Sequence, residues 1–195
     1  MPREHDYPNV HLPSIKTYYS QSMEKGIQIR LAKQKDAETI REIYNHEVRN
    51  STATFDLVER TTEEQEEWLT ERSGAFSVLV AEMSNKILGF ASLSPYKSRA
   101  AYRTTVEDSI YINEEFRNQG IAGELLFHLL EVAKSSGFHA VIARIGGANE
   151  ASIALHQRFD FEIVGTEKEI GRKFGKWQDV VVMQRIINAG GPEPK

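Results

Sequence analysis

Residues 107–123, Glu-Asp-Ser-Ile-Tyr-Ile-Asn-Glu-Glu-Phe-Arg-Asn-Gln-Gly-Ile-Ala-Gly, join an apolar strand to a glycine-containing turn and then to a long amphipathic helix. Glu107 supplies a carboxylate on the strand, and Arg117 supplies a cation at the turn. A helix that begins after such a turn leaves its first backbone N–H groups free to bind an anion. The stretch therefore predicts a phosphate-binding turn beside a candidate base.

The turn itself has the form Arg-x-x-Gly-x-Ala over residues 117–122. Gly120 lets the backbone approach a ligand closely, Ala122 avoids side-chain bulk, and the Arg117 guanidinium can pair with phosphate oxygens. The pattern lacks the GxGxxG of dinucleotide sites and the Lys-Ser/Thr of a P-loop. By itself, this short motif is equally compatible with an ordinary strand-to-helix turn.

Composition narrows the class of protein. A chain of 195 residues with a formal charge of −4 predicts one globular domain without a broad surface for nucleic acid or anionic membranes. Because there is no cysteine, a disulfide framework, a thiolate zinc site and a cysteine nucleophile are excluded. The six histidines show no metal-ligand spacing, so we expect no metal. With neither a long apolar run nor a signal peptide, the expected location is cytoplasmic.

Hydrophobic periodicity predicts the element order βααβββαβαββ. Asp36 is expected to cap the first helix, and Thr62 with Gln65 to form a capping box for the second. The final two strands are expected to flank a loop that contains Gly171, Gly175 and Trp177. The chain divides into a partly ordered N-terminal extension, one α/β domain and a flexible C-terminal tail, at residues 1–26, 27–187 and 188–195.

Four further segments make the motif specific: residues 43–46 (Ile-Tyr-Asn-His), 51–55 (Ser-Thr-Ala-Thr-Phe), 95–107 and 173–180. Together with the turn, they resemble the GNAT superfamily of N-acetyltransferases. Within it, they are most similar to the phosphinothricin and methionine sulfone/sulfoximine acetyltransferase branch, over about residues 27–187. The resemblance implies an α+β domain with a central, mixed, mostly antiparallel twisted sheet flanked by helices. It also implies acetyl-CoA as cosubstrate and a homodimer with the acceptor site near its interface.

The same resemblance assigns the cofactor site. The turn would grip the pyrophosphate of acetyl-CoA, and strand N–H groups would align the pantetheine arm. Asn149 and Ser152 lie on one helical face with His156. The residues expected to bind acetyl-CoA are Ile110, Tyr111, Ile112, Arg117, Asn118, Gln119, Gly120, Ile121, Ala122, Gly123, Asn149 and Ser152.

For catalysis, the resemblance points to Glu107 as the base that takes the amine proton, usually through water. An α-ammonium must lose a proton before its lone pair can attack a thioester. Asp108 lies on the opposite face of the strand by alternation and is the weaker candidate. His156 would hydrogen-bond the CoA sulfur or donate a proton to it, with a packing role as the alternative.

The acceptor site is expected to combine cations with apolar walls. Cationic side chains could bind the carboxylate or oxyanion of an amino-acid-like substrate, although solvated loop charges are the alternative. Aromatic side chains could form the walls, although they more often serve the core. The cations are Lys97, Arg99 and Arg103, and the aromatic residues are Phe55, Tyr102 and Trp177.

The leading hypothesis is direct acetyl transfer to the α-amine of a small amino-acid-like molecule. One rival changes the acceptor to a protein N-terminus or a polyamine. The acidic run at residues 63–67 would suit a polyamine, but it reads better as a solvated helix face. The other rival is a CoA-responsive regulatory protein without turnover.

Overall fold

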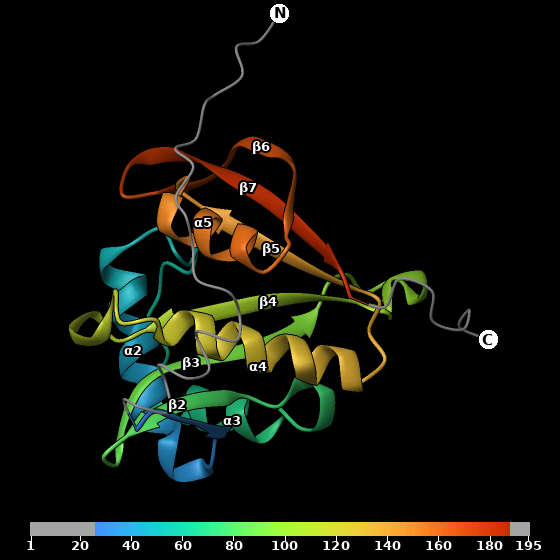
Figure 1. Ribbon diagram of the computed structural model, residues 1–195. Helices are drawn as coiled ribbons and strands as arrows, with labels where there is room; N and C mark the ends of the chain where they lie inside the picture. Colours follow the sequence, from blue (N-terminus) through green and yellow to red (C-terminus); the bar gives the residue numbers. More distant parts are fainter. Residues whose placement is uncertain (1–25, 188–195) are drawn as a thin grey trace, which may run out of the picture.

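The computed structural model describes residues 26–187, which form one seven-stranded sheet in the order β1-β2-β3-β4-β5-β7-β6 (Figure 1). All strand pairs are antiparallel except β4 with β5. The predicted element order and sheet type are confirmed, whereas the predictions for the 188–195 tail and for residues 1–25 lie outside the described residues. The elements are β1 Gln28–Leu31, α2 Ala37–Asn50, α3 Thr62–Thr70, β2 Leu79–Met83, β3 Lys86–Pro95, β4 Thr105–Ile112, α4 Ile121–Ser135, β5 Ala140–Gly146, α5 Glu150–Arg158, β6 Glu162–Lys173 and β7 Lys176–Ile186.

Two apolar clusters hold helices against opposite faces of the sheet (Figure 1). Residues of β2 alternate between the two clusters: Leu79 and Ala81 join one, and Val80 joins the other. This is the period-2 pattern of a strand buried on both faces. The α4 side chains that pack on the first face are Leu125, Leu126, Leu129, Leu130 and Ala133, and the α2 side chains on the second are Ile40, Ile43, Tyr44 and Val48.

The parallel strands β4 and β5 separate part-way along their length. Their paired residues begin with Thr105 opposite Ala140 and end with Glu107 opposite Ile142. Beyond that point β4 stays paired with β3 as far as Ile112, while β5 stays paired with β7 as far as Gly146. The two strands therefore diverge and leave a split in the sheet, with Glu107 at its base.

Of the two predicted helix caps, Asp36 is confirmed as the N-cap residue of α2, although without a side-chain cap hydrogen bond, and the cap of α3 is displaced by one residue. Thr61, not Thr62, is the N-cap of α3, and its capping-box partner is Glu64. Gln65 is instead buried and accepts a hydrogen bond from Arg60. The Asp36 side chain makes no cap hydrogen bond to α2, because its carboxylate accepts from the Lys33 backbone N–H at 2.7 Å and pairs with Arg30.

The expected loop between the last two strands was also wrong. Strand β6 continues to Lys173 and β7 begins at Lys176, so Gly171 and Trp177 lie in a long hairpin with Phe174 and Gly175 at its turn. Register shifts between Ile163 and Gly165 and between Glu167 and Gly171 absorb extra residues on the β6 side. These irregularities interrupt the alternation from which strands are predicted.

Candidate active site

A cavity of about 660 Å³ occupies the split between β4 and β5. Its walls come from β4, the turn before α4, β5, α5 and the loop after α2. Where strands diverge, their backbone N–H and C=O groups are no longer joined to each other and can bind an extended ligand. The cavity therefore joins an open strand edge to the turn that is predicted to bind an anion.

The turn adopts the conformation that its sequence predicts. Gly120 has a left-handed backbone (φ 87°) and is the N-cap of the 15-residue helix α4. Asn118 also has a positive φ of 60°. Arg117, Ile121, Ala122 and other turn residues line the cavity, so the positive end of the helix dipole and its first N–H groups face this region.

Glu47 connects the turn to helix α2. Its carboxylate forms an ion pair with Arg117 and accepts a hydrogen bond from the Ser51 hydroxyl at 2.5 Å. The Glu47 side chain is 6% exposed, whereas that of Arg117 is 44% exposed. The guanidinium is thus held at one edge by a buried carboxylate while much of it remains open to an anionic ligand.

Glu107 is the last β4 residue in register with β5, and it lines the cavity. Burial raises the pKa of its carboxyl above the ordinary value; Arg144 opposes this shift, and Asp108 and Glu167 add to it. Arg144 in turn pairs with Glu167 at 2.5 Å. A carboxylate with a raised pKa binds a proton more readily, which suits a general base.

His156 and Asp108 form a buried pair on the α5 side of the cavity. The two side chains are 5% and 2% exposed, and His156 Nε2 lies 3.0 Å from Asp108 Oδ2. His156 Nδ1 lies 2.7 Å from the Ser152 carbonyl oxygen. Burial lowers the pKa of His156, but Asp108 and the Ser152 carbonyl outweigh it and leave the pKa above the ordinary histidine value.

The loop of residues 51–55 closes the end of the cavity near α2. Buried Lys173 of β6 donates from Nζ to the Thr54 carbonyl at 2.7 Å and to the Glu47 carbonyl at 3.4 Å. The Phe55 ring lies directly over Gly146 of β5 and Gly171 of β6, where a side chain on either glycine would collide with it. These contacts fix Phe55 as a wall of the cavity.

Most of the residues predicted for the site meet in this cavity. Among the cofactor-binding and catalytic candidates, Gln119 is the exception and does not line the cavity. Its side-chain amide instead donates a hydrogen bond to the Glu115 carbonyl. Those that line the cavity are Phe55, Glu107, Ile110, Tyr111, Ile112, Arg117, Asn118, Gly120, Ile121, Ala122, Gly123, Asn149, Ser152 and His156.

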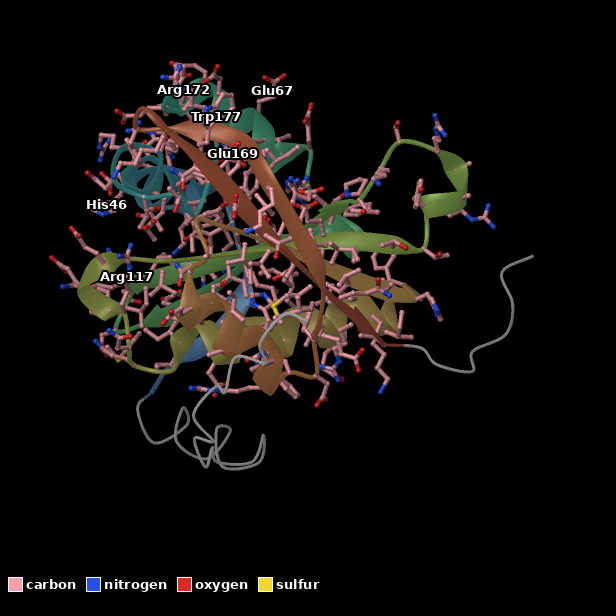
Figure 2. All side chains as sticks on the ribbon, turned by 90° about the horizontal axis from the view of Figure 1, so that it is seen from above. His46, Glu67, Arg117, Glu169, Arg172 and Trp177 are labelled. Carbon is pink, nitrogen blue, oxygen red and sulfur yellow. The ribbon has the colours of Figure 1, made fainter. Side chains whose placement is uncertain are left out.

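The other acceptor candidates lie outside the cavity wall of this chain. Lys97, Arg99, Tyr102 and Arg103 belong to the β3–β4 loop, where Lys97 Nζ lies 4.6 Å from the Tyr96 ring centre. Trp177 is 61% exposed. Figure 2 shows Trp177 and Arg172 together on the β6–β7 hairpin, and the green β3–β4 loop at the other side of the molecule.

Sequence reasoning missed Glu47 and Lys173, and gave Asp108 only a minor place. For Glu47 and Asp108, the sequence did contain an indication of a buried, partnered carboxylate. Glu47 falls on the apolar stripe of α2, three residues after Tyr44, and Asp108 shares its strand face with Val106, which is fully buried. A carboxylate on an apolar face needs a charged or hydrogen-bonding partner. Its partner, however, cannot be identified from spacing.

Comparison with known proteins identifies the family. Residues 29–182 match the acetyltransferase (GNAT) domain family. The chain belongs to the GNAT acetyltransferase family. It is 36% identical over 158 residues to the L-methionine sulfoximine/L-methionine sulfone acetyltransferase of Pseudomonas paraeruginosa, covering 80% of this chain and 92% of that protein.

The solved structures of two acetyltransferases resemble this fold closely. A phosphinothricin acetyltransferase from Sinorhizobium meliloti in complex with AcCoA has a TM-score of 0.80 and 37% identity, over 83% of this chain and 88% of that one. A ribosomal-protein-alanine N-acetyltransferase from Brucella melitensis has a TM-score of 0.80 and 38% identity, over 82% and 99% of the two chains. The GNAT assignment thus rests on sequence and fold together.

Residues 26–187 contain neither a candidate membrane-spanning helix nor a candidate metal site. None of the helices in that range is long and apolar enough to cross a membrane. No group of three or more His, Asp or Glu side chains there is placed to hold a metal ion.

Proposed function

We propose that this GNAT protein transfers the acetyl group of acetyl-CoA directly to the α-amine of a small amino-acid-like substrate. The observation that carries the proposal is the position of Glu107. It lies at the base of the strand split, in one cavity with both the anion-binding turn and the Phe55 loop. We further propose that the protein works as a cytoplasmic homodimer.

The described residues fit acetyl-CoA. Gly120 and Ala122 leave room for a diphosphate at the α4 N-terminus, and Arg117 is presented to it by Glu47. The β4 edge at residues 110–112 would hydrogen-bond the pantetheine amides. Asn149 and Ser152 would flank the arm from α5. Acetyl-CoA would supply the activated acetyl group as a thioester.

Glu107 would remove the proton that keeps the amine unreactive. Its carboxylate is partly buried, and its raised pKa increases its affinity for that proton. A positioned general base contributes about 10²- to 10⁴-fold in rate. His156 would act on the opposite side of the reaction, where the CoA thiolate leaves.

On the acceptor side, Phe55 would pack against the substrate side chain. Lys97, Arg99, Tyr102, Arg103 and Trp177 do not line the cavity of their own chain. We propose that they reach the acceptor from the second protomer of a homodimer.

A protein N-terminus is the second candidate acceptor, because the Brucella melitensis protein that resembles this fold is a ribosomal-protein-alanine N-acetyltransferase. Thiol release from acetyl-CoA should be measured in parallel with methionine sulfone, phosphinothricin, spermidine and a peptide with N-terminal alanine. Preferential release with the first two supports the proposal, and preference for the peptide supports the second candidate. Tight CoA binding without release for any amine would overturn both and favour a regulatory protein.

A further inference from the structure

Asp108 and His156 connect the two sides of the split at its first open position. Asp108 follows Glu107, the last β4 residue in register with β5. His156 belongs to α5, which follows β5 in the chain. The 3.0 Å contact between them therefore joins β4 to α5 at the residue that follows the proposed base in the chain, on the opposite face of the strand.

The partners of the His156 ring indicate its protonation state. Nδ1 faces the Ser152 carbonyl and Nε2 faces the Asp108 carboxylate, so both ring nitrogens face acceptor oxygens. A neutral imidazole has only one N–H to donate, whereas the imidazolium has two. The pair therefore holds one more proton than a neutral histidine beside an ionised aspartate.

The surroundings of the pair support this charge assignment. Asp108 Oδ1 has no hydrogen-bond partner among the described residues and is buried, so the ionised carboxylate depends on His156 for compensation. The His156 ring contacts Asp108 on β4, Ser152 on α5 and the edge-on ring of Phe161. The other charged side chains that line the cavity are Glu47, Glu107, Arg117, Arg144 and Arg158.

We propose that Asp108 is a positioning residue for acetyl transfer, which fixes the His156 ring across the split and keeps it protonated for the leaving CoA thiolate. This rests on the proposed function. In the balanced reaction, the substrate ammonium loses two protons to water through Glu107. The nitrogen–carbon bond forms as the carbon–sulfur bond breaks, and the CoA thiolate leaves near the positive charge of the His156 ring and takes one proton from water.

The direct test is a pH titration of the His156 ring by NMR in the CoA-free protein, comparing wild type with Asp108→Asn. The amide keeps the size of the side chain and removes its charge. We expect the proton affinity of His156 to fall about 10- to 100-fold, as for the loss of one buried charge-assisted hydrogen bond. An unchanged titration in the variant would overturn the proposal, whether or not the protein is an acetyltransferase.

Kinetics separate this role from a purely structural one. In Asp108→Asn, the alkaline limb of kcat should move to lower pH while the Kd for acetyl-CoA stays within about twofold, because the Arg117 turn is unchanged. The substitution should have little further effect on kcat in a His156→Asn background. A lower kcat with an unmoved pH profile and additive effects would leave Asp108 only a packing role and refute the proposal. Asp108→Ser, assayed in the same way, serves if Asp108→Asn does not fold.

Discussion

The contact between Phe55 and Gly171 predicts how the proposed acceptor end of the cavity responds to a single methyl group. A Cβ built on Gly171 lies 2.3 Å from Phe55 Cε2 and 2.5 Å from Cδ2. Ordinary van der Waals contact begins at 3.4 Å, so Gly171→Ala requires the Phe55 ring and the β6 backbone to separate by about 1 Å. Because Phe55 lines the cavity, this displacement changes the space available to the acceptor.

The expected effect is selective for the acceptor. A misplacement of about 1 Å near reacting groups can lower the rate by about 10²-fold, and we expect Gly171→Ala to lower kcat/KM for the acceptor by at least about 10-fold. Overpacking should also cost about 1–3 kcal/mol of stability. The affinity for acetyl-CoA should change little, because Gly171 is not among the residues that line the split.

Strand β6 offers a matched control. A Cβ on Gly165 meets nothing within 4 Å, so Gly165→Ala should leave kcat/KM near the wild-type value. Steady-state kinetics on both variants, with calorimetric binding of acetyl-CoA, give the comparison. The double variant Gly171→Ala with Phe55→Leu should recover part of the loss. The reasoning fails if Gly171→Ala matches Gly165→Ala within about twofold.

Three other predictions concern the cofactor turn, the base and the core. Arg117→Gln should weaken acetyl-CoA binding about 10- to 100-fold in calorimetry, because it removes a charge-assisted contact to the diphosphate; unchanged affinity would exclude the proposed grip. Because burial raises the pKa of Glu107, the acid limb of kcat/KM should lie above the ordinary glutamate range, since activity needs the deprotonated form and is lost as pH falls through the raised pKa. Arg144→Gln should move that limb to still higher pH, and a shift to lower pH would contradict the assigned electrostatics. Leu126→Ala, at a fully buried α4 position, should lower the free energy of unfolding in urea by about 2–5 kcal/mol, and a loss below about 1 kcal/mol would show that α4 does not pack as described.

The fold was predictable from the sequence where the apolar periodicity of a segment matches the face that it packs against the sheet. The α4 apolar stripe and the glycine-containing turn before it specify a strand–turn–helix unit, and the structure places both as expected. The β6–β7 hairpin was not predictable in the same way, because bulges near Gly165 and Gly171 break the alternation. The α3 cap was displaced by one residue because two adjacent threonines, Thr61 and Thr62, each have a possible capping-box partner three residues later.

Contacts between distant segments explain what the sequence left open at the site. Pairings between residues 47 and 117, between 108 and 156, and between 54 and 173 join positions that share no sequence spacing rule. Burial alone indicates that such polar side chains need partners, but only the sheet topology brings those partners together. The split itself arises because β4 and β5 separate after three residue pairs, beyond which β4 remains paired only with β3 and β5 only with β7.

The most direct test of the central claim is turnover by Glu107→Gln. The amide keeps the size of the side chain but cannot take the amine proton. With acetyl-CoA and the best acceptor from the parallel assay, product formation followed by mass spectrometry should fall by about 10²-fold or more in kcat. The Kd for acetyl-CoA should remain within about twofold of wild type, because the Arg117 turn is untouched. Full turnover by Glu107→Gln, with normal acetyl-CoA binding, would contradict Glu107 as the base.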